Sequence, residues 1–360
     1  MSVKPPSPRG RGAQSSALST RFALPVRAVD CDWLDEAEAI DGPAPKLRTH
    51  VTEEAARRII TRNTSPDIPF DRSINAYRGC EHGCIYCYAR PTHAYLDLSP
   101  GLDFESRLFA KPDAARLLRR ELSARNYRPA PIAMGTNTDP YQPIETRYRL
   151  TRQVLEVCLE TRHPVTITTK SDRILADLDL LAQMARRNLV GVAISITSLD
   201  AALSRLLEPR AASPAKRLAA VKALSGAGVP TYINVSPIIP AITEDWIERI
   251  LEAAAAQGAR GASWIMLRLP HEVAPLFREW LAAYFPDRAD KVMHIVQSVR
   301  EGRDYDSAFG TRMKPQGVWS DLIRARFRIA AARAGLSRGK LELDTAQFRP
   351  PARDGQLHLL

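Results

Sequence analysis

The sequence contains no long apolar stretch. No segment approaches the ~18 consecutive apolar residues of a membrane-spanning helix. The first residues, MSVKPPSPRGRG, lack the apolar core of a secretory signal. These two absences predict a cytoplasmic protein that has no membrane partner.

Cysteine is scarce and present in an odd number. Five cysteines occur in 360 residues, which does not make a disulfide framework. Three of them fall within eight residues, and clustered thiols in a reducing compartment indicate metal binding or catalysis. Cys158 lies among valines and leucines in a helical pattern, so we expect a buried, unreactive thiol. Cys31 has the acidic neighbours Asp30 and Asp32, which disfavour a reactive thiolate.

Acidic residues are in deficit. The chain has 51 Lys and Arg against 40 Asp and Glu, a formal net charge of +11. Residues 1–22 carry four basic and no acidic side chains, and residues 311–360 carry ten basic against four acidic. Such a balance favours DNA or RNA as a partner. The alternative is that the arginines only solvate the surface, because many arginine-rich proteins bind no polyanion.

The chain divides into four stretches by composition. Residues 1–22 are rich in Pro, Ser, Gly and Arg, so we expect a disordered basic tail. Residues 23–72 form an irregular N-terminal extension with a helix expected over residues 52–62. Residues 73–270 alternate short β-branched runs with helical patterns, and residues 271–360 indicate a helical C-terminal extension.

The central stretch predicts an α/β fold, a partial (β/α)6 TIM-like barrel. A complete eight-stranded barrel would need two further strands. The helices expected between the strands lie near residues 114–126, 151–162, 174–187 and 214–228, with another opening at Thr243. The expected strands are Ile74–Arg78, Ile132–Gly135, Val165–Thr169, Val190–Ile196, Thr231–Val235 and Ser263–Leu269.

Each expected strand ends in polar side chains. The carboxyl ends of parallel strands share one face, and in βα barrels chemistry gathers there. Six strands that end in polar side chains on one face predict a pocket lined by those side chains. They read Arg78-Gly79-Cys80, Gly135-Thr136-Asn137-Thr138-Asp139, Thr168-Thr169-Lys170-Ser171, Ser195-Ile196-Thr197, Asn234-Val235-Ser236 and Arg268.

The clustered cysteines follow the first expected strand as Cys80-Glu81-His82-Gly83-Cys84-Ile85-Tyr86-Cys87. Three thiolates at CxxxCxxC spacing on one loop suit three irons of a 4Fe–4S cluster, leaving the fourth iron without a protein ligand. The alternative is structural zinc, which needs four closed ligands. His82 is badly placed for that role, and His93 is conceivable as a fourth ligand, but no second ligand pair follows. The spacing favours the cluster.

The cysteine loop followed by βα units resembles the radical S-adenosylmethionine (SAM) superfamily from about Ser73 to Leu269. Within that range, Thr138–Glu145 and Thr169-Lys170-Ser171 resemble the group related to spore photoproduct lyase. The resemblance implies an enzyme in which a reduced 4Fe–4S cluster cleaves SAM to a 5′-deoxyadenosyl radical. It also implies an external electron donor such as a flavodoxin or ferredoxin.

The same resemblance implies roles for individual residues. Cys80, Cys84 and Cys87 would hold the cluster, and Tyr86 would lie beside it, near the adenine. Lys170 and Ser195 would bind the methionyl carboxylate of SAM, and Thr136 or Thr138 its amino group. The open alternatives are that Lys170 is a solvated loop charge and that Ser195 or Thr197 caps the next helix.

The substrate is less determined. The charge and the resemblance favour a nucleic-acid substrate and, with it, DNA repair. A peptide or metabolite is the alternative substrate. The alternative function is that of a zinc-stabilised nucleic-acid-binding protein without catalysis. In spore photoproduct lyase a cysteine after the second strand returns a hydrogen atom to the product, but residues 135–139 contain none. That absence argues against the same reaction.

Asp139 and Glu145 are acid–base candidates, although Asp139-Pro140 also suits a turn. Glu208 would contact ribose or substrate, or pair at a helix end.

Overall fold

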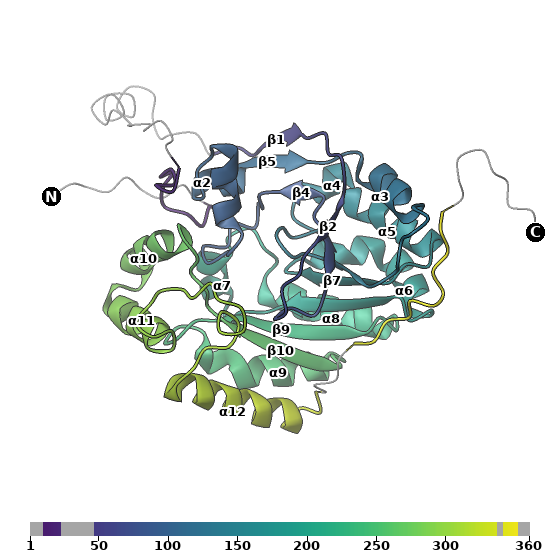
Figure 1. The fold of residues 1–360 in the computed structure, drawn as a ribbon. Helices are drawn as coiled ribbons and strands as arrows, with labels where there is room; N and C mark the ends of the chain where they lie inside the picture. Colours follow the sequence, from purple (N-terminus) through teal and green to yellow (C-terminus); the bar gives the residue numbers. More distant parts are fainter. Residues whose placement is uncertain (1–9, 23–46, 337–340, 352–360) are drawn as a thin grey trace, which may run out of the picture.

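A computed structural model describes residues 10–22, 47–336 and 341–351, and it centres on one seven-stranded sheet (Figure 1). Six strands are parallel neighbours, and β2 adds an antiparallel edge. The two outer strands, β2 and β10, do not pair, so the barrel is open and the predicted partial (β/α)6 fold is confirmed. In spatial order the strands are β10 (Gly261–Met266), β9 (Thr231–Ile238), β8 (Val190–Ser195), β7 (Val165–Thr169), β6 (Ile132–Met134), β3 (Arg72–Ile74) and β2 (Ile60–Arg62).

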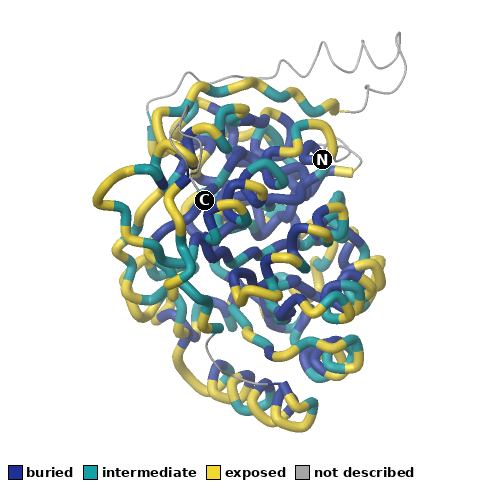
Figure 2. Tube along the Cα trace, turned by 90° about the vertical axis from the view of Figure 1, so that its right-hand side faces the viewer, coloured by how far each residue is buried: buried dark blue, intermediate teal, exposed yellow. Residues whose placement is uncertain are grey.

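Helices cover the outer face of this sheet, and the buried segments run through the centre of the molecule (Figure 2). Ser213 caps α8 (Pro214–Gly226) by accepting a hydrogen bond from the Lys216 backbone N–H, as its Ser-Pro start predicts. The helices and 3₁₀ turns between the strands are α3 (Ala114–Leu122), α4 (Glu145–Tyr148), α5 (Leu150–Glu160), η2 (Asp172–Asp177), α6 (Leu178–Ala185), α7 (Ala201–Leu207), α8 (Pro214–Gly226), η3 (Glu244–Trp246) and α9 (Ile247–Ala256).

A second, three-stranded sheet corrects two expectations. The strand expected over Ile74–Arg78 is divided between β3 and β4 (Tyr77–Arg78), and β4 pairs with β5 (Arg107–Ala110). The helix expected over residues 52–62 is wrong: β1 (His50–Glu53) pairs with β5, and β2 pairs with β3. Strand pairing, distant in sequence for β1 and nearby for β2, outweighs the local helical pattern there.

The expected disordered tail is wrong for residues 10–22, which pack against the folded chain. Arg11 and Ala13 are buried, and the Arg11 Nη1 donates to the carbonyl of Glu105 at 2.6 Å. The Ser15 carbonyl accepts from the Leu102 N–H at 3.2 Å, at the start of α2 (Leu102–Ser106). The composition of this segment alone indicates disorder, but hydrogen bonds to Glu105 and Leu102 hold it against the folded chain.

The C-terminal extension is helical, as expected, with α10 (Val273–Tyr284), α11 (Pro286–Ser298) and α12 (Val318–Arg333). α12 lies alongside α9 on the outside of the sheet (Figure 1). Arg312 pairs with Asp67 through two bonds of 2.7 Å, which ties this extension to the turn between β2 and β3. None of the helices in the described part of the chain is long and apolar enough to cross a membrane.

Candidate active site

The cysteine loop lies between β4 and the 3₁₀ helix η1 (Arg90–Leu96). Cys80 and Cys84 are buried and Cys87 is half-buried. The Cys80 N–H donates to the Phe104 carbonyl at 2.9 Å, and the Cys87 N–H to the Cys84 carbonyl at 3.2 Å. Gly83 has a φ of +67°, which a side chain would strain, so the loop turns tightly between its thiols.

A buried arginine holds this loop in place. The guanidinium of Arg90 donates to the Cys84 carbonyl at 2.9 Å, to the Gly83 carbonyl at 3.1 Å and to the Glu105 carboxylate at 2.5 Å. Glu105 also accepts from the N–H groups of Gly12 at 2.9 Å and Ala13 at 2.8 Å. The loop is therefore braced by its own following helix and by the N-terminal segment.

The thiols are close enough to influence one another. Burial, then the Asp139 charge and that of Cys84, hold the pKa of Cys80 well above its usual value. Burial and the Glu208 carboxylate raise the pKa of Cys84 to about 12, although the Lys170 charge acts in the opposite direction. A bound cation would offset this cost of ionising buried thiols.

Among the described residues, no three His, Cys, Asp or Glu side chains converge closely enough to hold a single metal ion. A cube of four irons does not require that convergence, because each cysteine binds a different iron. The donor set of three thiols on one braced loop therefore fits a cluster.

Lys170, at the carboxyl end of β7, is directed to the cysteine loop. Its Nζ lies 5.8 Å from the centroid of the Tyr86 ring. Asp139 anchors its backbone, accepting from the Lys170 N–H at 2.7 Å and from the Thr169 hydroxyl at 2.6 Å. Burial lowers the pKa of Lys170, but the charges of Cys84 and Glu208 outweigh it and raise the pKa above its usual value. Lys170 is therefore a half-buried cation whose ammonium lies over the Tyr86 ring beside the cysteine loop.

Glu208 is the centre of a buried network beside Lys170. It accepts from the hydroxyls of Tyr86 and Thr197 and pairs with the buried guanidinium of Arg217. Burial alone would raise the pKa of Glu208, but the charges of Arg217 and Lys170 lower it to about 2. The expected ion pair at a helix end is present, because Glu208 follows α7 and pairs with Arg217.

Ser195 ends β8, Thr197 follows it, and both are buried. Neither caps the next helix: α7 is capped by Asp200, whose carboxylate accepts from the Ala202 and Leu203 N–H groups. The Ser195 carbonyl accepts from Arg217 at 2.9 Å, which joins this strand end to the Glu208 network.

The two threonines after β6 are hydrogen-bonded to the segment from the end of β3 to β4. Thr136 is half-buried, and its hydroxyl accepts from the Asn75 amide at 3.0 Å. Thr138 is buried, and its hydroxyl donates to the Tyr77 carbonyl at 3.3 Å. Thr136 is thus the more accessible of the two.

The profile of the radical SAM superfamily matches residues 74–254. An uncharacterized protein of Mycobacterium tuberculosis is 38% identical over 230 residues, 63% of this chain and 68% of that protein. The chain belongs to the radical SAM superfamily. An uncharacterized protein of Methanocaldococcus jannaschii is 32% identical over 167 residues, 46% of this chain and 60% of that protein.

Solved structures of spore photoproduct lyase share the fold. One, complexed with a dinucleoside spore photoproduct, has a TM-score of 0.57 and 16% identity and covers 79% of this chain and 80% of that one. Another, a mutant lyase with the same photoproduct, has a TM-score of 0.57 and 14% identity over 85% of this chain and 92% of that one. The likeness shows a shared fold. The family match makes the chain a radical SAM enzyme, and members of this family use a 4Fe–4S cluster and SAM.

In this radical SAM enzyme the pKa values of the two acid–base candidates, Asp139 and Glu145, are shifted in opposite directions. Burial raises the pKa of Asp139, but the His82 charge and several hydrogen bonds lower it to about 2. Burial raises the pKa of Glu145 to about 7, and Glu145 accepts from the Tyr77 hydroxyl. Cys158 is fully buried, as expected, and Cys31 lies outside the described residues.

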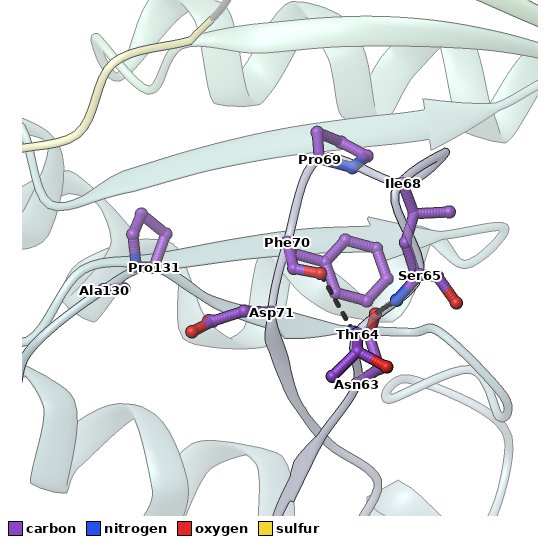
Figure 3. Close-up of a pocket in the computed structure, with 9 residues that line it drawn as sticks. All are labelled: Asn63, Thr64, Ser65, Ile68, Pro69, Phe70, Asp71, Ala130 and Pro131. Atoms are coloured by element: carbon purple, nitrogen blue, oxygen red, sulfur yellow. Dashed lines mark hydrogen bonds between the residues drawn. The ribbon is translucent and has the colours of Figure 1, made fainter.

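A hollow of about 510 Å³ opens on another part of the molecule (Figure 3). It lies where β3 and β6 begin, at the opposite end of these strands from the residues described above. Its lining offers no thiol, lysine or arginine, so it is not the radical SAM site. The lining residues are Asn63, Thr64, Ser65, Ile68, Pro69, Phe70, Asp71, Ala130 and Pro131.

Several residues of the site are not distinguished by the sequence. Tyr88, next to Cys87, donates its hydroxyl to the Thr136 carbonyl, and the Arg268 guanidinium lies 4.5 Å from the centroid of its ring. Arg90 and Glu105 meet only through the fold. Arg268 lies at a predicted strand end, but nothing in its neighbours indicates the stacking on Tyr88.

Proposed function

We propose that this enzyme binds a 4Fe–4S cluster through Cys80, Cys84 and Cys87 and cleaves SAM to act on a nucleic-acid substrate. The observation that carries the proposal is the braced loop of three thiols beside a fixed lysine at the carboxyl end of the sheet. When bound, the cluster supplies the electron that cleaves SAM to a 5′-deoxyadenosyl radical, which takes a hydrogen atom from the substrate.

The residues around the cysteine loop suit the polar ends of SAM. Lys170 offers an ammonium to the methionyl carboxylate, and the buried hydroxyl of Ser195 is a second donor. Thr136 offers an oxygen to the amino group. The Glu208 network fixes Tyr86, whose ring lies under Lys170, and the burial of these groups keeps water away.

The substrate assignment is supported by charge and by likeness. The net charge of +11 favours a polyanion. The lyase of similar fold binds a dinucleoside photoproduct. Residues 135–139 contain no cysteine, so we propose a reaction other than repair of that photoproduct. A reduced flavodoxin or ferredoxin in the cytoplasm would supply the electron; a peptide or metabolite substrate remains the alternative.

The test is anaerobic reconstitution with iron and sulfide, reduction, and measurement of 5′-deoxyadenosine released from SAM. We expect slow release without substrate. Lys170→Ala should weaken SAM binding roughly tenfold to a hundredfold, because one charge-assisted contact contributes about 1.5–3 kcal/mol. Lys222→Ala, on the exposed side of α8, is the matched control and should bind SAM normally.

Two results would contradict the proposal. A colourless protein that retains zinc and releases no 5′-deoxyadenosine would support a zinc-stabilised binding protein instead. An unchanged dissociation constant for Lys170→Ala would remove Lys170 from the SAM site.

A further inference from the structure

Two arginines lie near the carboxyl end of β10 without a carboxylate partner. Arg268 follows this strand, and Arg300 follows α11. The Arg300 Nη2 donates to the carbonyl of Leu267 at 2.6 Å, directly before Arg268. Within the described residues, no Asp or Glu oxygen lies within 4 Å of either guanidinium.

Arg300 is the more unusual of the two because it is only 5% exposed. Its Nε is buried and has no hydrogen-bond partner. Of the four other buried arginines, Arg72, Arg90 and Arg217 each pair with a carboxylate, and Arg11 donates to two carbonyls and a hydroxyl. A buried charge without such a partner is costly, so an anion at this position would stabilise it.

The groups around Arg300 do not neutralise the positive charge of its guanidinium. Burial and the neighbouring charge of Arg268 lower the pKa of Arg300 to about 10, while Tyr305 and Asp306 act weakly in the other direction. Asp306 is engaged elsewhere, accepting from the Thr311 hydroxyl at 2.6 Å and the Ala308 N–H at 2.9 Å.

Arg268 connects this charge to the cysteine loop. Its guanidinium stacks on Tyr88 and donates to the Met313 sulfur at 3.1 Å. The Tyr88 side chain is 45% exposed, so part of the ring is free to meet a ligand. An arginine fork beside an exposed aromatic ring suits a nucleotide, because the fork matches phosphate oxygens and the ring stacks on a base.

We propose that Arg268 binds a phosphodiester of the nucleic-acid substrate, with buried Arg300 adding positive charge behind it and Tyr88 stacking on the adjacent base. The assignment rests on the proposed function and names the residues that place the substrate beside the cysteine loop. Phosphate is favoured over a carboxylate because two unbalanced guanidiniums and the basic chain suit a polyanion.

The test uses the reconstituted enzyme and a labelled single-stranded DNA oligonucleotide titrated at several salt concentrations. Arg268→Ala should weaken binding about tenfold at low salt and reduce the slope of log affinity against log salt by about 0.7. Arg268→Lys should lose less, because it keeps the charge without the fork. Arg249→Ala is the matched control: Arg249 is exposed on α9 and lies 4.5 Å from the Trp246 ring, so the same charge and stacking are removed elsewhere.

Other outcomes would overturn the assignment. One is an equal loss of oligonucleotide affinity in Arg268→Ala and Arg249→Ala. The others are a wild type that binds no oligonucleotide, and binding of an acidic peptide that depends on Arg268. A raised dissociation constant for SAM with unchanged oligonucleotide binding would place Arg268 on the cofactor. Release of 5′-deoxyadenosine separates the two proposals: a wild type that cleaves SAM but binds no oligonucleotide overturns only the phosphodiester site.

Discussion

Charged side chains around the cysteine loop are arranged so that the carboxylates stay ionised. Glu208 and Asp139 both have a pKa lowered to about 2, because cations and hydrogen bonds outweigh the effect of burial. Each is therefore a fixed negative charge rather than a proton donor near neutral pH. Glu208 offsets part of the positive charge of buried Arg217 and half-buried Lys170, which helps these charged groups to lie close together.

His163 should make folding stability depend on pH. It is fully buried, its Nε2 lies 2.8 Å from the Tyr127 hydroxyl, and burial lowers its pKa from 6.5 to about 4. Because the folded-state pKa is depressed, the unfolded chain takes up the proton first as pH falls below about 6.5. The free energy of unfolding should therefore decrease by about 2 kcal/mol from this group between pH 7.5 and pH 5.

Denaturant unfolding of the wild type and His163→Gln at both pH values measures this contribution. At pH 7.5 the variant should have a lower free energy of unfolding than the wild type. Between pH 7.5 and pH 5 its free energy of unfolding should fall by about 2 kcal/mol less than that of the wild type. Equal losses in the two proteins would show that His163 does not titrate in this window. His93, whose pKa burial also lowers to about 4, stays present in both and does not affect the difference.

At the scale of elements, the N-terminal segment supports the cysteine loop. A Cβ on Gly12 would lie 1.8 Å from the Gly83 carbonyl oxygen, so only glycine permits the observed approach. Residues 11–13 also supply the N–H and guanidinium donors that meet Glu105. Removing residues 1–22 would remove this support together with the basic charges.

Gly12→Ala should displace this segment and lower the free energy of unfolding by about 1–3 kcal/mol, the usual cost of overpacking. Gly226→Ala, in α8 with nothing within 4 Å of the added Cβ, is the control and should be neutral or more stable by about 0.5–1 kcal/mol. Denaturant unfolding and hydrogen exchange of residues 79–87 give the two readouts. Unchanged stability and exchange in Gly12→Ala would mean that the segment does not brace the loop.

The same elements show what the sequence can predict. β6 and β8 are almost wholly buried, and β7 and β9 largely alternate buried with half-buried residues, so the positions of these strands follow from local β-branched composition. β1 depends on β5, more than fifty residues along the chain, β2 depends on pairing with the nearby β3, and residues 10–22 depend on Glu105, so the local helical and coil patterns predict these segments wrongly. At the site, the cysteines and Lys170 stand in recognisable positions, whereas the Arg90–Glu105 pair and the Arg268–Tyr88 stack arise only when distant segments meet.

Across the whole molecule, the open barrel leaves one side between β2 and β10 without strand pairing. The Arg312–Asp67 pair links the segment before α12 to the β2–β3 turn across the two ends of this sheet. The same C-terminal extension supplies Arg300, and it carries Met313 against Arg268. The extension therefore contributes to the proposed phosphodiester site as well as covering the sheet.

The central claim is that one loop binds the cluster, and iron and acid-labile sulfide content tests it most directly. Anaerobically reconstituted wild type and Cys158→Ala should each hold about four irons and four sulfides per chain. Cys80→Ala, Cys84→Ala and Cys87→Ala should each lose most of both, because every thiol binds its own iron. Full loading in any of these three variants, or loss of the cluster in Cys158→Ala to the same extent, would contradict the account.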